Sequence, residues 1–143
     1  MVKGMVLVFC VLLGGIMENI NEITDMGERA VYFKHHGSNC LQSVLRAYGD
    51  KISLTDDQIK ALGAGFGAGM GGMEGTCGAL VGAVMVKGMI DPSMNPMKAK
   101  AMVEEFKKES GAVRCRDLKG IDTGVMLCPC DQCIRNAVSI LEK

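Results

Sequence analysis

Four widely separated cysteines each stand where the sequence predicts that a helix begins. They are Cys40, Cys77, Cys115 and Cys130. The first turn of a helix exposes unpaired backbone N–H groups and a partial positive charge, so a thiol placed there is biased toward its thiolate form. A fold that brings the four helix starts together would surround negative sulfur with positive charge. This convergence favours a metal or redox site over an ordinary apolar core.

Composition limits the other classes of function. The 143 residues suit one domain, and sixteen acidic side chains balance sixteen basic ones. Because no basic stripe is interleaved with aromatic residues, we expect no nucleic-acid partner. No Ser/His/Asp grouping indicates a hydrolase, and we assign no catalytic residue. The seven cysteines are odd in number and mostly widely spaced, which favours a metal or redox site in a reduced compartment over a disulfide scaffold.

The N-terminal residues 1–16 contain a short apolar run. A bilayer span takes about 20 apolar residues, so we expect no membrane association, and the cleavage pattern of a signal peptide is missing. We favour translation from Met17, because Gly14-Gly15-Ile16 can be encoded by a purine-rich ribosome-binding sequence just before an ATG. On this hypothesis Cys10 has no role, and residues 17–143 form a single redox-type helical domain. A weak signal-like segment is the other interpretation of residues 1–16.

From Glu18 onward the spacing of apolar residues predicts helices. No segment alternates apolar and polar residues between turn signals, so we predict no strand. The fold class is therefore all-α, a compact bundle of about five to six helices with a glycine-rich loop. The expected helices span residues 18–37, 39–48, 55–62, 77–89, 97–109 and 131–141, with a short turn of helix at 115–118.

The segment Gly63–Gly75 is too rich in glycine for an ordinary helix or strand, so we expect a loop whose backbone approaches another group closely. Nucleotide binding is not expected, because the strand of a dinucleotide fingerprint and the Lys-Ser/Thr ending of a P-loop are missing. Beside Cys77, an apolar loop suits a lid over a metal cluster. Gly78 and Gly82 form a small-residue face that lets another backbone approach, and this face would also suit a homodimer. The residues expected to line a cluster are Gly75, Gly78, Gly82, Met70 and Met73.

Further cysteines and two histidines are candidate ligands. Cys128, Cys130 and Cys133 form a CxC that overlaps a CxxC, which is moderate evidence for a metal site. The βαβ context of a thioredoxin-like couple is missing. His35 and His36 precede a helix end, where they complement the helix dipole, and they are secondary candidates as ligands. Covalent haem is not expected, because no Cys-x-x-Cys-His is present.

These motifs together resemble the redox-active proteins known as the C_GCAxxG_C_C family, relatives of which are often labelled split-Soret cytochrome c. The resemblance runs from about Glu28 to Lys143. Its motifs are Asn39-Cys40-Leu41-Gln42, the glycine loop with Cys77-Gly78-Ala79-Leu80-Val81-Gly82, Cys115-Arg116-Asp117-Leu118, and the segment from Cys130 to Glu142. The resemblance implies an all-α cytoplasmic protein with a redox or iron–sulfur role, of a kind found in anaerobic bacteria and archaea. Haem is not carried over, because the attachment sequence is missing.

We therefore expect one-electron transfer through an iron–sulfur cluster. The expected ligands are Cys40, Cys77, Cys115 and Cys130, with Cys128 and Cys133 as substitutes or extra ligands. Helix starts and loop amides would stabilise the negative sulfur, and Met70, Met73 and Met85 would exclude water. The chain would then act with an unidentified electron-transfer partner protein, as an electron carrier or redox accessory protein rather than a stand-alone enzyme.

Two other functions remain open on the sequence. One is a metal-free thiol–disulfide oxidoreductase, which would use Cys130 and Cys133 or a pair of cysteines far apart in the chain. The other is a zinc-stabilised structural or binding module that performs no chemistry.

Overall fold

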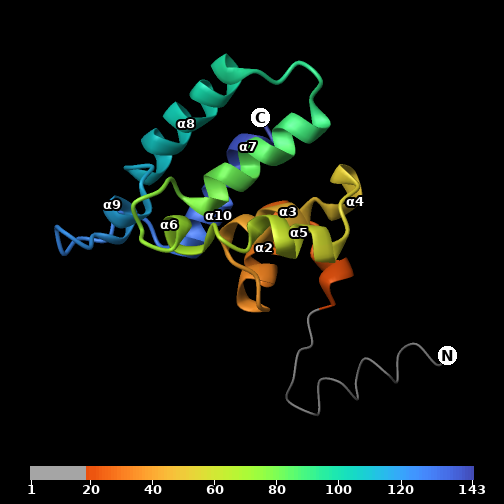
Figure 1. Cartoon of the computed structure of the whole chain (residues 1–143), viewed down its shortest axis with the longest axis horizontal. Helices are drawn as coiled ribbons and strands as arrows, with labels where there is room; N and C mark the ends of the chain where they lie inside the picture. Colours follow the sequence, from red (N-terminus) through yellow and green to blue (C-terminus); the bar gives the residue numbers. More distant parts are fainter. Residues whose placement is uncertain (1–18) are drawn as a thin grey trace, which may run out of the picture.

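A computed structural model of the chain describes residues 19–143. Within this range the protein is helical and has no β-strand, which confirms the all-α prediction, although Thr76 and Arg114 form one isolated antiparallel bridge. The predicted N-terminal segment 1–16 and the start at Met17 lie outside the described residues. The elements, shown in Figure 1, are a 3₁₀ turn η1 (Ile20–Glu22) and the helices α2 (Met26–His35), α3 (Cys40–Ala47), α4 (Gly49–Ile52), α5 (Asp56–Gly63), α6 (Gly67–Met70), α7 (Gly78–Ile90), α8 (Pro96–Ser110), α9 (Cys115–Lys119) and α10 (Cys130–Leu141).

The structure has more helices than the five or six predicted. The difference lies in short elements, because α4 and α6 are single helical turns that the sequence pattern did not separate from their neighbours. The prediction of a helix from Glu18 was also wrong. The Asp25 side chain accepts a hydrogen bond from the Glu28 N–H and so caps α2, which begins only at Met26.

Side-chain caps set most of the other helix starts. Asn39 and Gln42 form a reciprocal capping box at α3, and Thr55 and Gln58 form another at α5. Asn95 caps α8, whose first residue is Pro96. Asn39 is the N-cap directly before Cys40, so this capping box fixes Cys40 as the first residue of α3.

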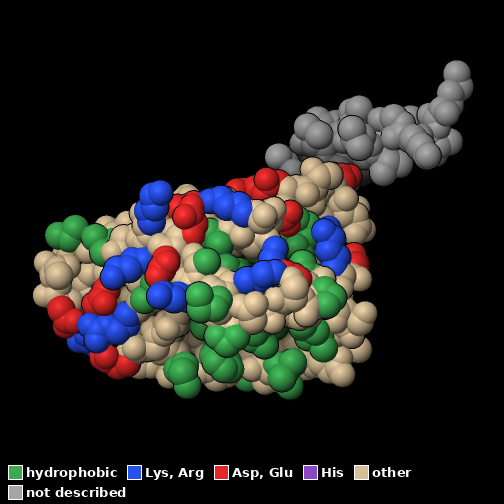
Figure 2. Space-filling view, turned by 90° about the horizontal axis from the view of Figure 1, so that it is seen from above, with side chains coloured by type: hydrophobic (Ala, Val, Ile, Leu, Met, Phe, Trp, Pro, Cys, Tyr) green, Lys and Arg blue, Asp and Glu red, His purple; other side chains and the backbone are tan. Residues whose placement is uncertain are grey.

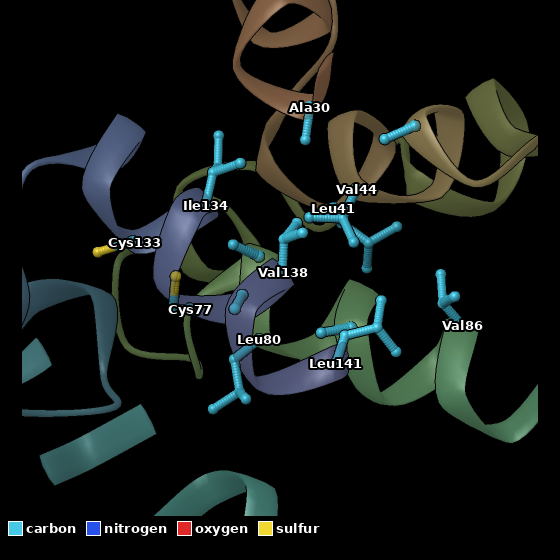
Figure 3. Packing of buried hydrophobic residues seen from close by; sticks show 14 of the residues in the cluster. Ala30, Leu41, Val44, Cys77, Leu80, Val86, Cys133, Ile134, Val138 and Leu141 are labelled. Atoms are coloured by element: carbon cyan, nitrogen blue, oxygen red, sulfur yellow. The ribbon is translucent and has the colours of Figure 1, made fainter. Parts of the chain in front are cut away.

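The core lies where α3, α7 and α10 meet, with α2 and α8 packed around them. Figure 3 shows Leu41, Leu80 and Val138 among the buried side chains of this cluster, all of which are at most 3% exposed. The close approach of α3 and α7 depends on glycine. A Cβ at Gly82 would meet the Leu41 carbonyl oxygen at 3.1 Å. The small-residue face predicted to suit a homodimer is therefore occupied within the chain.

No helix among residues 19–143 is long and apolar enough to cross a bilayer. The surface nevertheless carries exposed apolar side chains, and Figure 2 shows that they gather in the lower part of that view while charged side chains dominate its upper part. Among the most exposed are Met97 on α8, at 75%, and Met70 at the end of α6, at 67%.

Candidate functional site

Five of the cysteines line a single cavity of about 200 Å³. Its lining residues include members of α6, α9 and the start of α10; Figure 1 shows α6 and α9 toward the left of the molecule. All the cysteines that the structure describes are free thiols. The cysteines of the cavity are Cys40, Cys77, Cys115, Cys130 and Cys133, and the remaining walls come from Lys34, Asn39, Ala68, Gly69, Met73, Gly78, Leu118 and Lys119.

Four of these cysteines stand at helix starts. Cys40, Cys115 and Cys130 are the first residues of α3, α9 and α10, and Cys77 is the residue just before α7. The fifth, Cys133, lies three residues after Cys130 on α10, so both face the same side of that helix. Cys77, Cys115 and Cys133 are buried, whereas Cys40 and Cys130 are half-buried. The cavity therefore reaches solvent on the side of Cys40 and Cys130.

Backbone hydrogen bonds bring Cys77 and Cys115 side by side, although they are far apart in the chain. The Cys77 N–H donates to the Val113 carbonyl oxygen at 2.8 Å, and the Cys115 N–H donates to the Gly75 carbonyl oxygen at 3.0 Å. These two bonds flank the isolated bridge between Thr76 and Arg114. The start of α9 is thus fixed against the segment that leads into α7.

The glycine-rich segment forms one wall of the cavity. Its backbone is left-handed at Gly69, with a φ of +60°. A Cβ at this position would lie 2.6 Å from the Cys115 Cβ, so only glycine fits there. Ala68 and Met73 also line the cavity and also have positive φ, at 52° and 61°, which costs on the order of 1 kcal/mol for each non-glycine residue. Such strain in a cavity wall is typical of a functional site.

The half-buried cysteines form one pair of interacting thiols. A hydrogen bond from the Cys40 thiol, together with the positive charge of Lys119, lowers the pKa of Cys130 to about 5. The same hydrogen bond, together with burial, raises the pKa of Cys40. The pair therefore loses its first proton more readily than a free thiol does.

The buried cysteines Cys77 and Cys133 form a second pair, and Figure 3 shows them beside the apolar core. A hydrogen bond from the Cys133 thiol lowers the pKa of Cys77 to about 7, and the N–H groups of Leu80 and Ala79 in the first turn of α7 act in the same direction. The hydrogen bond and burial raise the pKa of Cys133. The fifth cysteine, Cys115, differs, because burial is the largest influence on its thiol and raises its pKa.

Lys119, the last residue of α9, brings a positive charge into the cavity. Its Nζ donates a hydrogen bond to the Cys128 carbonyl oxygen at 2.9 Å and lies 3.8 Å from the Cys133 Sγ. Burial alone would lower the pKa of Lys119, but negative charge on the neighbouring cysteine sulfurs, that of Cys130 among them, outweighs burial and raises it. Lys119 was not among the predicted site residues, although its position four residues after Cys115 on a helix could have indicated it.

Several predicted site residues lie outside the cavity. Cys128 is buried, and its Sγ contacts the Pro129 carbonyl oxygen at 3.7 Å and the Asn136 side-chain nitrogen at 3.9 Å. Met70 is exposed, and Met85 packs against the apolar core. Gly75 and Gly82 do not line the cavity: Gly75 packs against Gly69, and Gly82 packs against α3.

The two histidines also point elsewhere. The His35 Nε2 lies 2.8 Å from the Asp131 Oδ2 and joins the end of α2 to the start of α10. The His36 Nδ1 lies 2.7 Å from the Tyr32 carbonyl oxygen, and its ring stacks on the Tyr32 ring. Neither histidine lines the cavity. In the part of the chain from 19 to 143, no three His, Cys, Asp or Glu side chains are placed to share a single metal ion.

Comparisons with known proteins agree with the motifs. Neither the curated proteins nor the solved structures gave a match to this chain. A family model described as "Putative redox-active protein (C_GCAxxG_C_C)" matches residues 38–143, which contain all five cysteines of the cavity. Because this match covers most of the sequence, the chain belongs to the C_GCAxxG_C_C family of redox-active proteins.

Proposed function

We propose that the cavity holds an iron–sulfur cluster and that the protein transfers single electrons. The observation that carries this proposal is the convergence of five cysteine thiols on one cavity of about 200 Å³. An ordinary core of this size has no need for so many thiols at one place. Cysteine thiolates are the usual protein ligands of iron–sulfur clusters, which take four of them.

The donor set fits such a cluster. Cys40, Cys77 and Cys130 supply three thiols from the starts of three helices, and a fourth is available from Cys115 or Cys133. The ligands of a cluster bind different iron atoms, so they need not surround one point as the ligands of a single ion do. Five thiols line this cavity, and no three of the described side chains are placed to share one ion, so the cavity suits a cluster better than one metal ion.

The other residues of the cavity would adjust the charge and the solvent access of the cluster. When bound, the cluster supplies one-electron chemistry. The Lys119 and Lys34 ammonium groups offset the negative charge of thiolate and sulfide, while Met73 and Leu118 exclude water. Gly69 lets the loop backbone close against Cys115. Together these contacts control the charge, solvent access and hydrogen bonding that set a reduction potential.

The half-buried pair Cys40 and Cys130 marks the side on which an electron would enter or leave. We infer that an electron-transfer partner protein docks there, beside Lys34 and the contact of His35 with Asp131. Free thiols of this number persist in a reducing compartment, which favours the cytoplasm.

Anaerobic purification tests the proposal. We expect the wild-type protein, isolated or reconstituted without oxygen, to contain iron and acid-labile sulfide and to absorb visible light that dithionite bleaches. C130S should lose iron, whereas C128S should keep it, because Cys128 is buried outside the cavity. Wild-type protein with neither iron nor visible absorbance after reconstitution would overturn the proposal.

A second candidate function is metal-free thiol–disulfide exchange, which the thiol pairs favour. The Cys130 thiolate would attack a disulfide substrate, forming a mixed disulfide and releasing one substrate thiolate, which takes up a proton. The Cys40 thiol would then lose its proton and attack the Cys130 sulfur, forming a Cys40–Cys130 disulfide and releasing the second substrate thiol. The other pair expected from the sequence, Cys130 with Cys133, lies three residues apart on α10, and both residues line the cavity.

Oxidised glutathione separates the two candidates. The exchange function predicts that metal-free protein is oxidised rapidly and reversibly, and that C40S stops at the mixed disulfide on Cys130. The zinc-stabilised module is not favoured, because a structural zinc site places four ligands around one ion and no three described side chains are so arranged.

A further inference from the structure

The glycine-rich segment of residues 67–75, which we call the glycine strap, carries a carboxylate that ties it to α9. We propose that Glu74 is a positioning residue, which holds the strap closed over the cavity and so limits how fast small molecules and metal ions reach the buried thiols. The inference goes beyond the proposed cluster function, because it concerns access to the cavity and applies equally to the metal-free protein.

Glu74 lies between two arginines at the start of α9. Its Oε2 lies 3.2 Å from the Arg114 Nη1, and its Oε1 lies 3.3 Å from the Arg116 Nη1. Arg114 also donates two hydrogen bonds to the Asp117 carboxylate, at 3.1 and 2.9 Å. Arg116 donates two to the Asp122 carboxylate, at 2.7 and 2.9 Å. Because paired hydrogen bonds fix a planar guanidinium, the two arginines present a preset positive site to the carboxylate of the strap.

The residues on either side of Glu74 are the points at which the strap meets α9. The Arg116 N–H donates to the Met73 carbonyl oxygen at 2.8 Å, and the Cys115 N–H donates to the Gly75 carbonyl oxygen at 3.0 Å. Met73 and Cys115 both line the cavity. The ion pairs of Glu74 therefore act directly beside the thiols that the strap covers.

The backbone of the strap opposes closure. Ala68, Met70 and Met73 have positive φ values of 52°, 62° and 61°, a conformation that residues with a side chain rarely adopt. The Met70 side chain is exposed and adds little packing. An open strap would relieve this strain, whereas the ion pairs of Glu74 exist only while the strap lies on α9. Closure therefore depends on the contacts with α9, and those of Glu74 can be removed by changing one side chain.

Two buried cysteines can report on opening of the strap. The strap covers Cys115 closely, since a Cβ at Gly69 would lie 2.6 Å from the Cys115 Cβ. Cys128 is also buried but lies outside the cavity. Alkylation of Cys115 therefore measures opening of the strap, and alkylation of Cys128 measures wider unfolding.

Alkylation of the metal-free protein by iodoacetamide, mapped to each cysteine by mass spectrometry, tests the inference. E74Q keeps the size of the side chain and removes its charge. We expect Cys115 to react about three- to tenfold faster in E74Q than in the wild type, as the loss of two exposed ion pairs allows, with Cys128 unchanged. The matched control is E105Q, which removes a surface ion pair with Lys143 outside the cavity and should leave both rates unchanged. An unchanged rate at Cys115, an equal acceleration at Cys128 or an equal effect of E105Q overturns the proposal.

The salt concentration gives a second readout, for which the wild type suffices as the folded sample. Iodoacetamide is uncharged, so salt does not change its attraction to the protein. Screening of the Glu74 ion pairs should raise the Cys115 rate of the wild type toward that of E74Q, whose own rate should change less. An equal salt dependence in the two proteins contradicts a role for these ion pairs.

The reconstituted protein shows whether the strap also controls access of metal. We expect E74Q to match the wild type in iron content and visible absorbance but to release iron to a chelator severalfold faster. Equal release rates, or an altered absorbance of E74Q, contradict the positioning role. If the wild type binds no iron, the cluster function fails, and the alkylation rates of the metal-free protein still decide the role of Glu74.

Discussion

The Lys119 ammonium lies 3.8 Å from the Cys133 sulfur. A hydrogen bond that Lys119 donates to the Cys128 carbonyl oxygen holds it there. A positive charge held at this place stabilises the more negative form of any redox centre in the cavity. Because Cys133 and Lys119 come from different helices, α10 and α9, their contact also joins the two sides of the cavity.

Replacing Lys119 should lower the reduction potential of the loaded protein. In K119M the reduced centre loses a neighbouring positive charge, so reduction becomes less favourable. We expect a decrease on the order of 59 mV, which corresponds to a tenfold change in a one-electron equilibrium. K119R should retain most of the wild-type potential, and K107M on the exposed face of α8 serves as the control for an altered net charge. An unchanged potential in K119M, measured by a redox titration, would show that this charge does not act on the centre.

Substitution of Gly69 should destabilise the wall of the cavity. In G69A, the added Cβ would lie 2.6 Å from the Cys115 Cβ on a backbone with a φ of +60°. We expect a loss of about 1–3 kcal/mol in the free energy of unfolding of the metal-free protein. The matched control is G72A, because a Cβ at Gly72 meets nothing within 4 Å. Urea unfolding measures both variants, and equal stability of G69A and G72A would be inconsistent with the close contact described.

The Asn39 cap should affect both stability and cluster retention. Asn39 caps α3 directly before Cys40, and its side-chain nitrogen donates to the Gly63 carbonyl oxygen at 2.7 Å. N39A should therefore lose about 1–2 kcal/mol in unfolding free energy and should also release iron faster. T55A removes the equivalent capping box at α5, which lies outside the cavity, and should reduce stability without faster iron release. Iron release to a chelator, followed by absorbance, distinguishes the two variants.

The metal-free protein should be most stable near the pKa of a free thiol. The folded-state pKa of Cys130 is lowered to about 5, so its contribution to stability is present above the unfolded pKa of about 8.5 and is lost as the pH falls toward 5. Cys77 acts in the same direction, with a folded pKa of about 7. Between pH 5 and about 8.5 the unfolded chain binds more protons than the folded one, so stability should rise with pH.

Above about pH 8.5 the sign should reverse. The folded-state pKa values of Cys40 and Cys133 are raised, so these thiols stay protonated in the folded protein after they ionise in the unfolded chain. Stability should therefore decline as the pH rises further. Urea unfolding across this range under reducing conditions measures the curve, and C130S should show a weaker rise on the acid side. A stability that falls steadily from pH 5 to 8.5 contradicts the thiol pairs.

Local signals in the sequence predicted much of the helical framework, because short-range hydrogen bonds set helix starts. The helices predicted at 39–48, 55–62 and 97–109 begin within two residues of the caps at Asn39, Thr55 and Asn95. The first helix was predicted to begin at Glu18, which is too early, because the residue that caps α2 is Asp25. The left-handed turn at Gly69 could be anticipated only as a loop, since its exact path depends on contact with Cys115.

The arrangement of the site could be predicted only in part. Helix starts indicated Cys40, Cys77, Cys115 and Cys130, and the structure brings all four to one cavity. The partner of each thiol depends on how α10 rotates against α3 and α7, which local sequence does not determine. For the same reason the sequence did not indicate that Cys133 faces the cavity while Cys128 faces away.

The most direct test of the central claim is electron paramagnetic resonance of the anaerobically reconstituted wild-type protein, with visible absorbance recorded on the same sample before and after reduction by dithionite. We predict that reduction bleaches the visible absorbance and changes the paramagnetic signal in proportion to the iron content, and that the double variant C40S/C130S shows neither change. A wild-type protein that folds, contains all its thiols and yet shows no bound iron, no absorbance and no signal under these conditions would contradict the account.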